Sequence, residues 1–358
     1  TGGPVAGNLW AMGRKDKASG PAGAALIVDV EDPGLAQEAQ LVAVVTGRRV
    51  CSPEEVVTAA GVTVLTDREE QRWERAARVI RVDQWDPPLA AGGAVSLAEY
   101  LVAADVPRVA VFSACGGAGG SVFTLALAGC LSAQSQEALV VDADPLSVGL
   151  DLLAGVEQDP GWRLRDIGAD AGEEVIDQMP WVGGNDYDVA IASNRGGTVA
   201  DIRRTLPVLL RQRVPIVVDF GRVRVREGAW QEEVLRMVQP DAVLLVAPLS
   251  VAGLDAARTA LDHLSAVAAV PACGRGQVVL RRLAGTRRRK YRRGGGAEVD
   301  VPMAAMMLDQ APVGVIDHDE YVQAALDAGD FDLTSGALGS AAVEALGEVL
   351  GDSLEVRV

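Results

Sequence analysis

Histidine, cysteine and aromatic side chains are scarce in this sequence of 358 residues. The chain has two histidines and four cysteines, and no two cysteines are spaced as a CxxC pair. This spacing excludes a disulfide framework and a zinc pattern, and two histidines leave little for histidine-based catalysis. Aromatic residues make up 4% of the chain, which suits closely packed layers of helix on sheet better than a sandwich or barrel.

Long apolar runs and an excess of positive charge are also missing. No apolar run approaches the about 20 residues that span a bilayer, and the first residues lack the apolar core of a signal peptide. We therefore expect a cytoplasmic protein. The formal net charge is −16, which argues against general nucleic-acid binding because such binding needs a basic face.

One segment departs from this acidic composition. The stretch "RRLAGTRRRKYRRGGG" (281–296) holds eight basic residues and no acidic residue. Most runs of this kind are solvated loops, and the alternative is an electrostatic contact with anionic lipid or DNA. That contact would use Arg287, Arg288, Arg289, Lys290, Arg292 and Arg293.

Apolar, β-branched runs alternate with helical stretches along the chain. The runs "RVAVFSA" (108–114), "EALVVDAD" (137–144) and "VPIVVDFG" (214–221) are typical of buried strands. Strands of this kind, joined by helices, predict an α/β fold with a mostly parallel sheet covered on both faces. The pattern predicts a flexible lead (1–23), a small α/β domain (24–84), a linker and connecting helix (85–107), a larger α/β domain (108–334) and a C-terminal helix and tail (335–358).

The glycine-rich stretch "CGGAGGS" (115–121) stands between a predicted strand and a predicted helix. A phosphate-binding loop requires this context, because backbone amides and the positive end of the helix dipole converge there. Ser121 stands where a hydroxyl would meet Mg²⁺. The alternative is a turn that only packs the helix on the sheet. The predicted nucleotide contacts are Gly116, Gly117, Ala118, Gly119, Gly120, Ser121 and Val122.

This loop resembles the deviant Walker A motif, KGGxGK[ST], of the ParA/MinD group of P-loop ATPases. Cys115 stands at the first, signature lysine of that motif, and Gly120 stands at the second. A lysine ammonium supplies charge at the β- and γ-phosphates and stabilises the transition state. The resemblance therefore implies that the backbone holds ADP or ATP weakly, with slow or absent hydrolysis.

Two acidic strand ends extend the resemblance. The stretch "LVVDADPLSVGLDLLAG" (139–155) resembles the family's second strand and its following loop, and "VPIVVDFGR" (214–222) resembles its Walker B strand. The resemblance implies a catalytic role for Asp144. It also implies that Ser121, Asp142 and Asp219 surround Mg²⁺, with Asp219 acting through water. Aspartates in such places also serve simply to cap the next helix.

The end of the larger domain departs from the family pattern. The family usually has an Asn-Arg pair after the next strand, and that asparagine reads adenine. This chain has Arg281 and Arg282 in "VVLRRL", so the resemblance does not tell how a base is recognised. His318 falls in the closing segment (311–330), where a lone loop histidine is more often solvated than catalytic.

The order of the two domains resembles the CpaE/TadZ branch, especially the actinobacterial CpaE-like proteins also called septum site-determining protein Ssd. Members of that branch place a receiver-like domain before the ATPase domain. A working receiver needs clustered acids and a later lysine. Acids follow the predicted strands at Asp29, Glu31, Asp32 and Asp67, but the sequence has no lysine between Lys17 and Lys290. We expect a pseudo-receiver that serves in interaction or dimerisation.

The resemblance implies a spatial regulator, which either places a Tad-type (Flp) pilus secretion machine or controls the septum site in cell division. It implies a nucleotide-linked homodimer that secretion, pilus or division proteins recruit to the inner face of the membrane, a pole or the septum. One alternative is a slow MinD-like ATPase in which Arg195, Arg222 or another arginine replaces the lysine. The others are a nucleotide-free scaffold and a DNA-partitioning protein that uses the basic segment.

Overall fold

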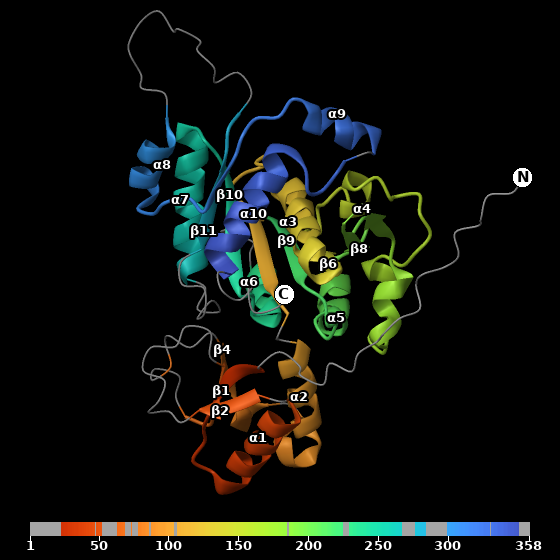
Figure 1. The fold of residues 1–358 in the computed structure, drawn as a ribbon, viewed down its shortest axis with the longest axis vertical. Coiled ribbons are helices and arrows are strands. Elements are labelled where there is room, and N and C mark those ends of the chain that lie inside the picture. The colour runs from red at the N-terminus through yellow and green to blue at the C-terminus, as the bar shows by residue number, and fades with distance from the viewer. Residues whose placement is uncertain are drawn as a thin grey trace, which may run out of the picture.

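Two separate β-sheets, each with its own helices, organise the chain in the computed structural model (Figure 1). The structure describes residues 23–46, 48–51, 63–68, 73, 78–85, 87–103, 106–184, 186–224, 229–266, 276–283, 299–329 and 331–350. Outside these residues lie nearly all of the predicted lead, two stretches of the predicted small domain (52–62 and most of 69–77), the basic residues 287–293 and the last residues of the tail.

The smaller sheet contains four parallel strands in the order β2-β1-β3-β4. This is the order of the first four strands of the flavodoxin-like arrangement, which receiver domains also adopt. A receiver role for this domain stays a prediction. The described elements are β1 (Gly23–Asp29), α1 (Pro33–Val45), β2 (Arg48–Cys51), β3 (Thr63–Thr66), β4 (Arg78–Arg81) and α2 (Gly93–Ala103).

Helix α2 belongs to the core of this smaller sheet. Its residues Leu97 and Leu101 are fully buried in one cluster with Leu26 of β1 and Val42 of α1. The stretch predicted as a linker and connecting helix (85–107) therefore contributes a packed helix to the N-terminal core. The exact domain limits stay a prediction.

The larger sheet contains eight strands in the order β12-β11-β10-β5-β9-β6-β8-β7, and all its neighbours pair in parallel except β7 with β8. The predicted mostly parallel sheet is confirmed. Its strands are β5 (Arg108–Ser113), β6 (Glu137–Asp142), β7 (Trp181–Gly183), β8 (Asp188–Ala192), β9 (Ile216–Arg222), β10 (Ala242–Pro248), β11 (Gln277–Arg281) and β12 (Gly314–Ile316). The edge strands β7 and β12 have three residues each, which is too short to leave a periodic signal in the sequence.

Helices cover both faces of the larger sheet and bury two apolar clusters. One face carries α5 (Val199–Leu209), α6 (Ala229–Val238), α7 (Val251–Ala266) and α8 (Val301–Leu308). The other carries α3 (Gly120–Ser135), α4 (Leu150–Leu153) and α10 (Gly336–Leu350). Helix α9 (Tyr321–Ala328) follows β12 and has no fully buried residue.

Helix α10 lies beside α3 on the second face (Figure 1). Gly129 of α3 lets the segment just before α10 approach closely, because a Cβ there would lie 2.7 Å from the Cβ of Leu333. The predicted C-terminal helix is thus packed into the core of the larger domain. No helix in the described part of the chain is long and apolar enough to cross a membrane.

The two sheets meet at the amino-terminal edge of the larger one. Arg108, the first residue of β5, is fully buried and places its guanidinium 5.5 Å from the ring of Tyr100 in α2. The Tyr100 hydroxyl donates a hydrogen bond to the side-chain oxygen of Gln239, which precedes β10. Ligands bind at the opposite, carboxyl edge of such sheets, so the N-terminal domain leaves that edge uncovered.

Candidate functional site

The glycine-rich loop joins the carboxyl end of β5 to α3 in an open, anion-receptive conformation. Gly117 and Gly119 have φ of 74° and 96°, a region that favours glycine. Gly119 caps α3 without any side-chain hydrogen bond. In the described part of the chain, the amides of Gly120, Ser121 and Val122 have no hydrogen-bond partner. These donors, together with the positive end of the helix dipole, can bind a phosphate group.

The two positions where the resembled motif has lysine are filled differently. Cys115 is half-buried and packs against the apolar cluster beneath α3. At Gly120 a Cβ would lie only 2.2 Å from the Oγ of Ser113. The loop is therefore packed around a glycine, and a lysine at 120 requires the Ser113 hydroxyl to move.

Asp142 and Asp219 form a buried acidic pair beside this loop. Asp142 ends β6 and Asp219 lies in the middle of β9. The two are direct partners in register, and their exposures are 0% and 1%. Burial, aided by the charge of Asp219, raises the pKa of Asp142 to about 7. Burial also raises the pKa of Asp219 to about 6, and the Ser121 hydroxyl and Gly221 amide oppose that rise.

The residues present fit a magnesium ion. The Oδ2 atom of Asp219 is buried and accepts no hydrogen bond from any described residue. An orphaned carboxylate oxygen next to a loop hydroxyl is a site that a divalent cation would satisfy. No cluster of three or more His, Cys, Asp or Glu ligands occurs among the described residues. In nucleotide sites, Mg²⁺ is usually held by one or two protein groups, phosphate oxygens and several waters.

Asp144 lies at the same edge but is already engaged. Its Oδ1 atom forms an ion pair with Nη2 of Arg224 at 3.2 Å and accepts the amide of Leu146 at 3.0 Å. Its Oδ2 atom is so close to Gly221 that a Cβ there would lie 2.1 Å away. Before Asp144 can orient a water molecule, its contact with Arg224 has to be released or shared.

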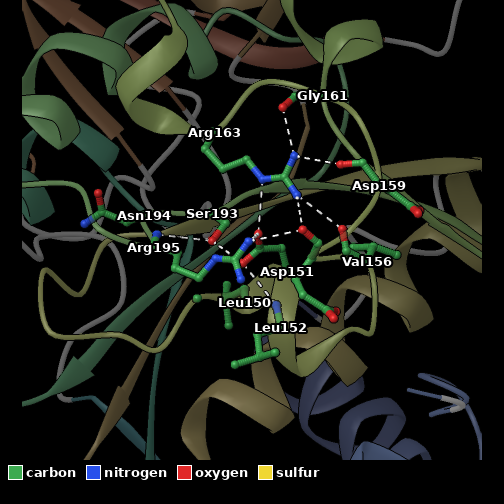
Figure 2. A network of polar contacts seen from close by, with 12 residues as sticks. Leu150, Asp151, Leu152, Val156, Asp159, Gly161, Arg163, Ser193, Asn194 and Arg195 are labelled. Atoms are coloured by element: carbon green, nitrogen blue, oxygen red, sulfur yellow. Dashed lines mark hydrogen bonds and ion pairs between the residues drawn. The ribbon is translucent and has the colours of Figure 1, made fainter. Parts of the chain in front are cut away.

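Another buried carboxylate, Asp151, was assigned no role from the sequence. It is fully buried in α4, accepts three hydrogen bonds and forms a further ion pair with Arg195. Its Oδ2 atom pairs with Nε of Arg163 at 3.1 Å and with Nη2 of Arg195 at 3.2 Å, and its Oδ1 atom accepts the hydroxyl of Ser193 at 2.7 Å. Figure 2 shows both guanidinium groups directed at this one carboxylate.

Arg163 extends this network into the loop that follows α4. Its guanidinium also donates to four backbone carbonyls (Figure 2), which belong to Val156, Glu157, Asp159 and Gly161. The network fastens this loop to the carboxyl end of β8. Because Arg195 is held by Asp151, it is not a free replacement for the missing lysine.

A pocket of about 180 Å³ opens beside the glycine loop. Gly119 and Val122 line one side, Arg281 lines another, and the segment after β12, with Asp317 and His318, completes it. Nη1 of Arg281 donates to the carbonyl of Gly117 at 3.1 Å. The structure thus brings the predicted loop together with Arg281 and His318, although 164 positions separate Gly117 from Arg281.

The acids predicted at the edge of the smaller sheet also gather, around an arginine. Arg68 places its Nε 3.6 Å from Oδ1 of Asp29 and its Nη2 3.3 Å from Oε1 of Glu31. Asp67 accepts the backbone amides of Glu31 and Asp32. A guanidinium therefore lies among these carboxylates.

Solved structures place this architecture in a known fold. The chain aligns with a ParA family ATPase from Chlorobium tepidum (TM-score 0.50, 20% identity, 67% of this chain and 97% of that one). It aligns with MinD in the MinC:MinD cell division complex of Aquifex aeolicus (TM-score 0.51, 14% identity, 69% and 96%). The fold is that of the ParA and MinD ATPases. The septum site-determining MinD of Pyrococcus horikoshii, complexed with Mg-ADP, aligns similarly (TM-score 0.50, 17% identity, 69% and 98%).

The relatives found by sequence comparison do not refine this result. The uncharacterized proteins Rv3660c and MT3760 from two strains of Mycobacterium tuberculosis are each 32% identical over 169 residues. This match spans 44% of the chain and 44% of each relative, so it covers less than half of their length. No family model matches the chain.

Proposed function

We propose that this protein is a nucleotide-binding spatial regulator that binds Mg·ADP or Mg·ATP weakly and hydrolyses ATP slowly or not at all. The observation that carries the proposal is the orphaned Oδ2 of Asp219 beside Ser121, at the start of a helix with unpaired amides. Ser121 and Asp219 would hold Mg²⁺, and the ion would neutralise the negative charge of the phosphates. Gly116 to Val122 would hold the phosphates through their amides.

The same residues favour binding over catalysis. No lysine stands in the loop, and Asp144, the candidate for orienting water, is paired with Arg224. Phosphoryl transfer depends on charge positioned for the transition state. Binding of the phosphates in the ground state can instead use the backbone amides. We therefore expect the protein to bind nucleotide and to hydrolyse little ATP.

The regulatory role rests on fold and on sequence resemblance. MinD, one of the proteins with this fold, is described as septum site-determining and occurs in a complex with MinC. For this chain we propose the CpaE/TadZ/Ssd type of role, in pilus placement or septum control, as a nucleotide-linked homodimer. The N-terminal domain would serve as a pseudo-receiver for partner binding, because Arg68 already occupies its acidic edge. The basic segment would contact anionic lipid or DNA.

Calorimetry on the whole chain tests the nucleotide site. We expect Mg·ADP to bind with a dissociation constant of about 10–1,000 µM. Ser121→Ala should weaken that binding by about tenfold in the presence of Mg²⁺ and much less with EDTA, because the hydroxyl acts through the metal. Ser340→Ala, on the remote face of α10, is the matched control. No heat and no thermal shift at millimolar ligand would instead favour a nucleotide-free scaffold.

Placing a lysine in the loop tests the proposal that the protein binds ATP but hydrolyses it slowly or not at all. The double variant Ser113→Ala, Gly120→Lys removes the oxygen that lies 2.2 Å from the new Cβ and places an ammonium in the loop. We expect single-turnover ATP hydrolysis to rise by at least about tenfold over the wild type. Ser113→Ala alone is the control and should change nothing. A wild-type rate already well above background, which falls in Asp144→Ala, would show a slow ATPase instead.

A further inference from the structure

The carboxyl edge of the larger sheet is strongly acidic, so a polyphosphate needs a cation there. Asp142, Asp144 and Asp219 stand on one side of the glycine loop, and Asp317 and Asp319 line the pocket on the other. The loop itself carries no positive side chain. The negative charges of these carboxylates oppose the binding of an anion. Without a cation, only the backbone amides of the loop and the helix dipole would attract the phosphates.

Several arginines reach this edge, and most of them are neutralised by carboxylates. Arg195 pairs with Asp151, Arg224 pairs with Asp144, and Nε of Arg282 lies 2.8 Å from Oδ1 of Asp317. In the described part of the chain, Arg281 forms no ion pair. Its guanidinium donates a hydrogen bond from Nη1 to the carbonyl of Gly117.

We propose that Arg281 is the phosphate-binding cation of this site and takes the place of the two absent lysines. The proposal rests on the nucleotide-binding function proposed above. Arg281 ends β11, its guanidinium touches the glycine loop from the side of the pocket, and its Nη1 lies 3.0 Å from where a Cβ of Gly119 would be. No other arginine in the described part of the chain forms a hydrogen bond or ion pair with the loop between Cys115 and Ser121.

The chemistry of arginine suits this position. One N–H group is used on the Gly117 carbonyl, and a guanidinium carries five N–H donors in a fixed fork. The remaining donors are free to meet phosphate oxygens in the neighbouring pocket. Hydrogen bonds between charged groups are about twice as strong as neutral ones. Because Arg281 is anchored to the loop, it brings charge to the phosphate-binding amides with little further loss of side-chain freedom.

Titration of purified full-length variants with Mg·ADP and Mg·ATP tests this assignment. We expect Arg281→Ala to weaken binding by at least about tenfold. Arg281→Lys should retain most of the affinity because it keeps the charge. Arg281→Gln keeps a polar side chain but is neutral, so it should bind as weakly as the alanine variant. Increasing salt should weaken wild-type binding more steeply than Arg281→Gln binding.

Two neighbouring arginines provide the controls. Arg282→Ala removes the partner of Asp317 and leaves that carboxylate uncompensated beside the pocket, so it should weaken binding, but less than Arg281→Ala. Arg222 is exposed at the end of β9, and Arg222→Ala should have little effect. A ligand-free thermal melt of each variant shows whether it is folded; if Arg281→Ala is not, Arg281→Gln and Arg281→Lys carry the test.

The possible results separate this inference from the function on which it rests. A wild type that binds neither nucleotide overturns the proposed function and this assignment with it. Wild-type binding that is unchanged in Arg281→Gln overturns only the assignment of Arg281, because the positive charge is then not needed. Nucleotide binding that is lost in Arg222→Ala but kept in Arg281→Ala also overturns the assignment of Arg281. It would identify Arg222 as the phosphate-binding cation instead.

Discussion

Replacing Asp151 with alanine is expected to lower the free energy of unfolding by about 3–5 kcal/mol. The carboxylate is fully buried, accepts three hydrogen bonds and forms ion pairs with two guanidinium groups. Without it, the guanidinium of Arg163, which is itself 9% exposed, stays buried without a counter-charge. Removing one member of a buried ion pair leaves an uncompensated charge, and this cost exceeds the value of the bond itself.

Urea unfolding of the variant and the wild type measures this change. Asp159→Ala is the matched control, because Asp159 lies in the same loop with an exposed side chain and contributes only its carbonyl to Arg163 (Figure 2). We expect that control to stay within about 0.5 kcal/mol of the wild type. A loss below about 1 kcal/mol in Asp151→Ala would mean that water or another acceptor readily replaces the carboxylate.

Short-range sequence patterns predicted the core of the larger domain well. Strands β5, β6 and β9 are continuous apolar runs, and the structure places them side by side in a parallel sheet. The carboxyl ends of neighbouring parallel strands meet at one edge. Asp142 and Asp219 could therefore be expected near the glycine loop before any coordinates were known.

The contacts that the sequence did not reveal join residues far apart in the chain. Arg281 reaches Gly117 across 164 positions, and Ser193 reaches Asp151 across 42. Neither contact leaves a local pattern, because which side chains meet is decided by strand order and loop path. The clash between a Cβ at Gly120 and Ser113 is of the same kind. A missing lysine is visible in the sequence, but the packing that accommodates its absence is not.

Asp142 and Asp219, the two buried acids of the site, lower the stability of the fold when they are ionised, whereas Asp151 raises it. Asp151 is compensated by two arginines, whereas Asp219 keeps an oxygen with no partner and faces Asp142 and Asp144. An uncompensated buried carboxylate opposes folding when it is ionised. Such a group is retained against stability where a ligand uses it, which supports a cation-binding role for this edge.

Asp219→Asn is accordingly expected to raise the free energy of unfolding of the nucleotide-free protein by about 3 kcal/mol near neutral pH. The folded-state pKa of Asp219 is about 6, against an ordinary value of 3.8. The folded protein therefore binds the proton more tightly than the unfolded chain, and the penalty is fully present above the folded pKa. It fades as the pH falls through about 6 towards 4, since a protonated carboxyl is neutral in both states.

Urea unfolding at about pH 7.5 and about pH 5 resolves this behaviour. The stability advantage of Asp219→Asn over the wild type should be large at the higher pH and clearly smaller at the lower one. Asp188→Asn, which changes an exposed aspartate at the amino end of β8, should show no such dependence. The same Asp219→Asn protein should lose most of the Mg²⁺ dependence of nucleotide binding. An asparagine variant less stable than the wild type at both pH values would mean that the carboxylate is stabilised by its surroundings, and Asp219 would then not be the uncompensated group that a magnesium ion satisfies.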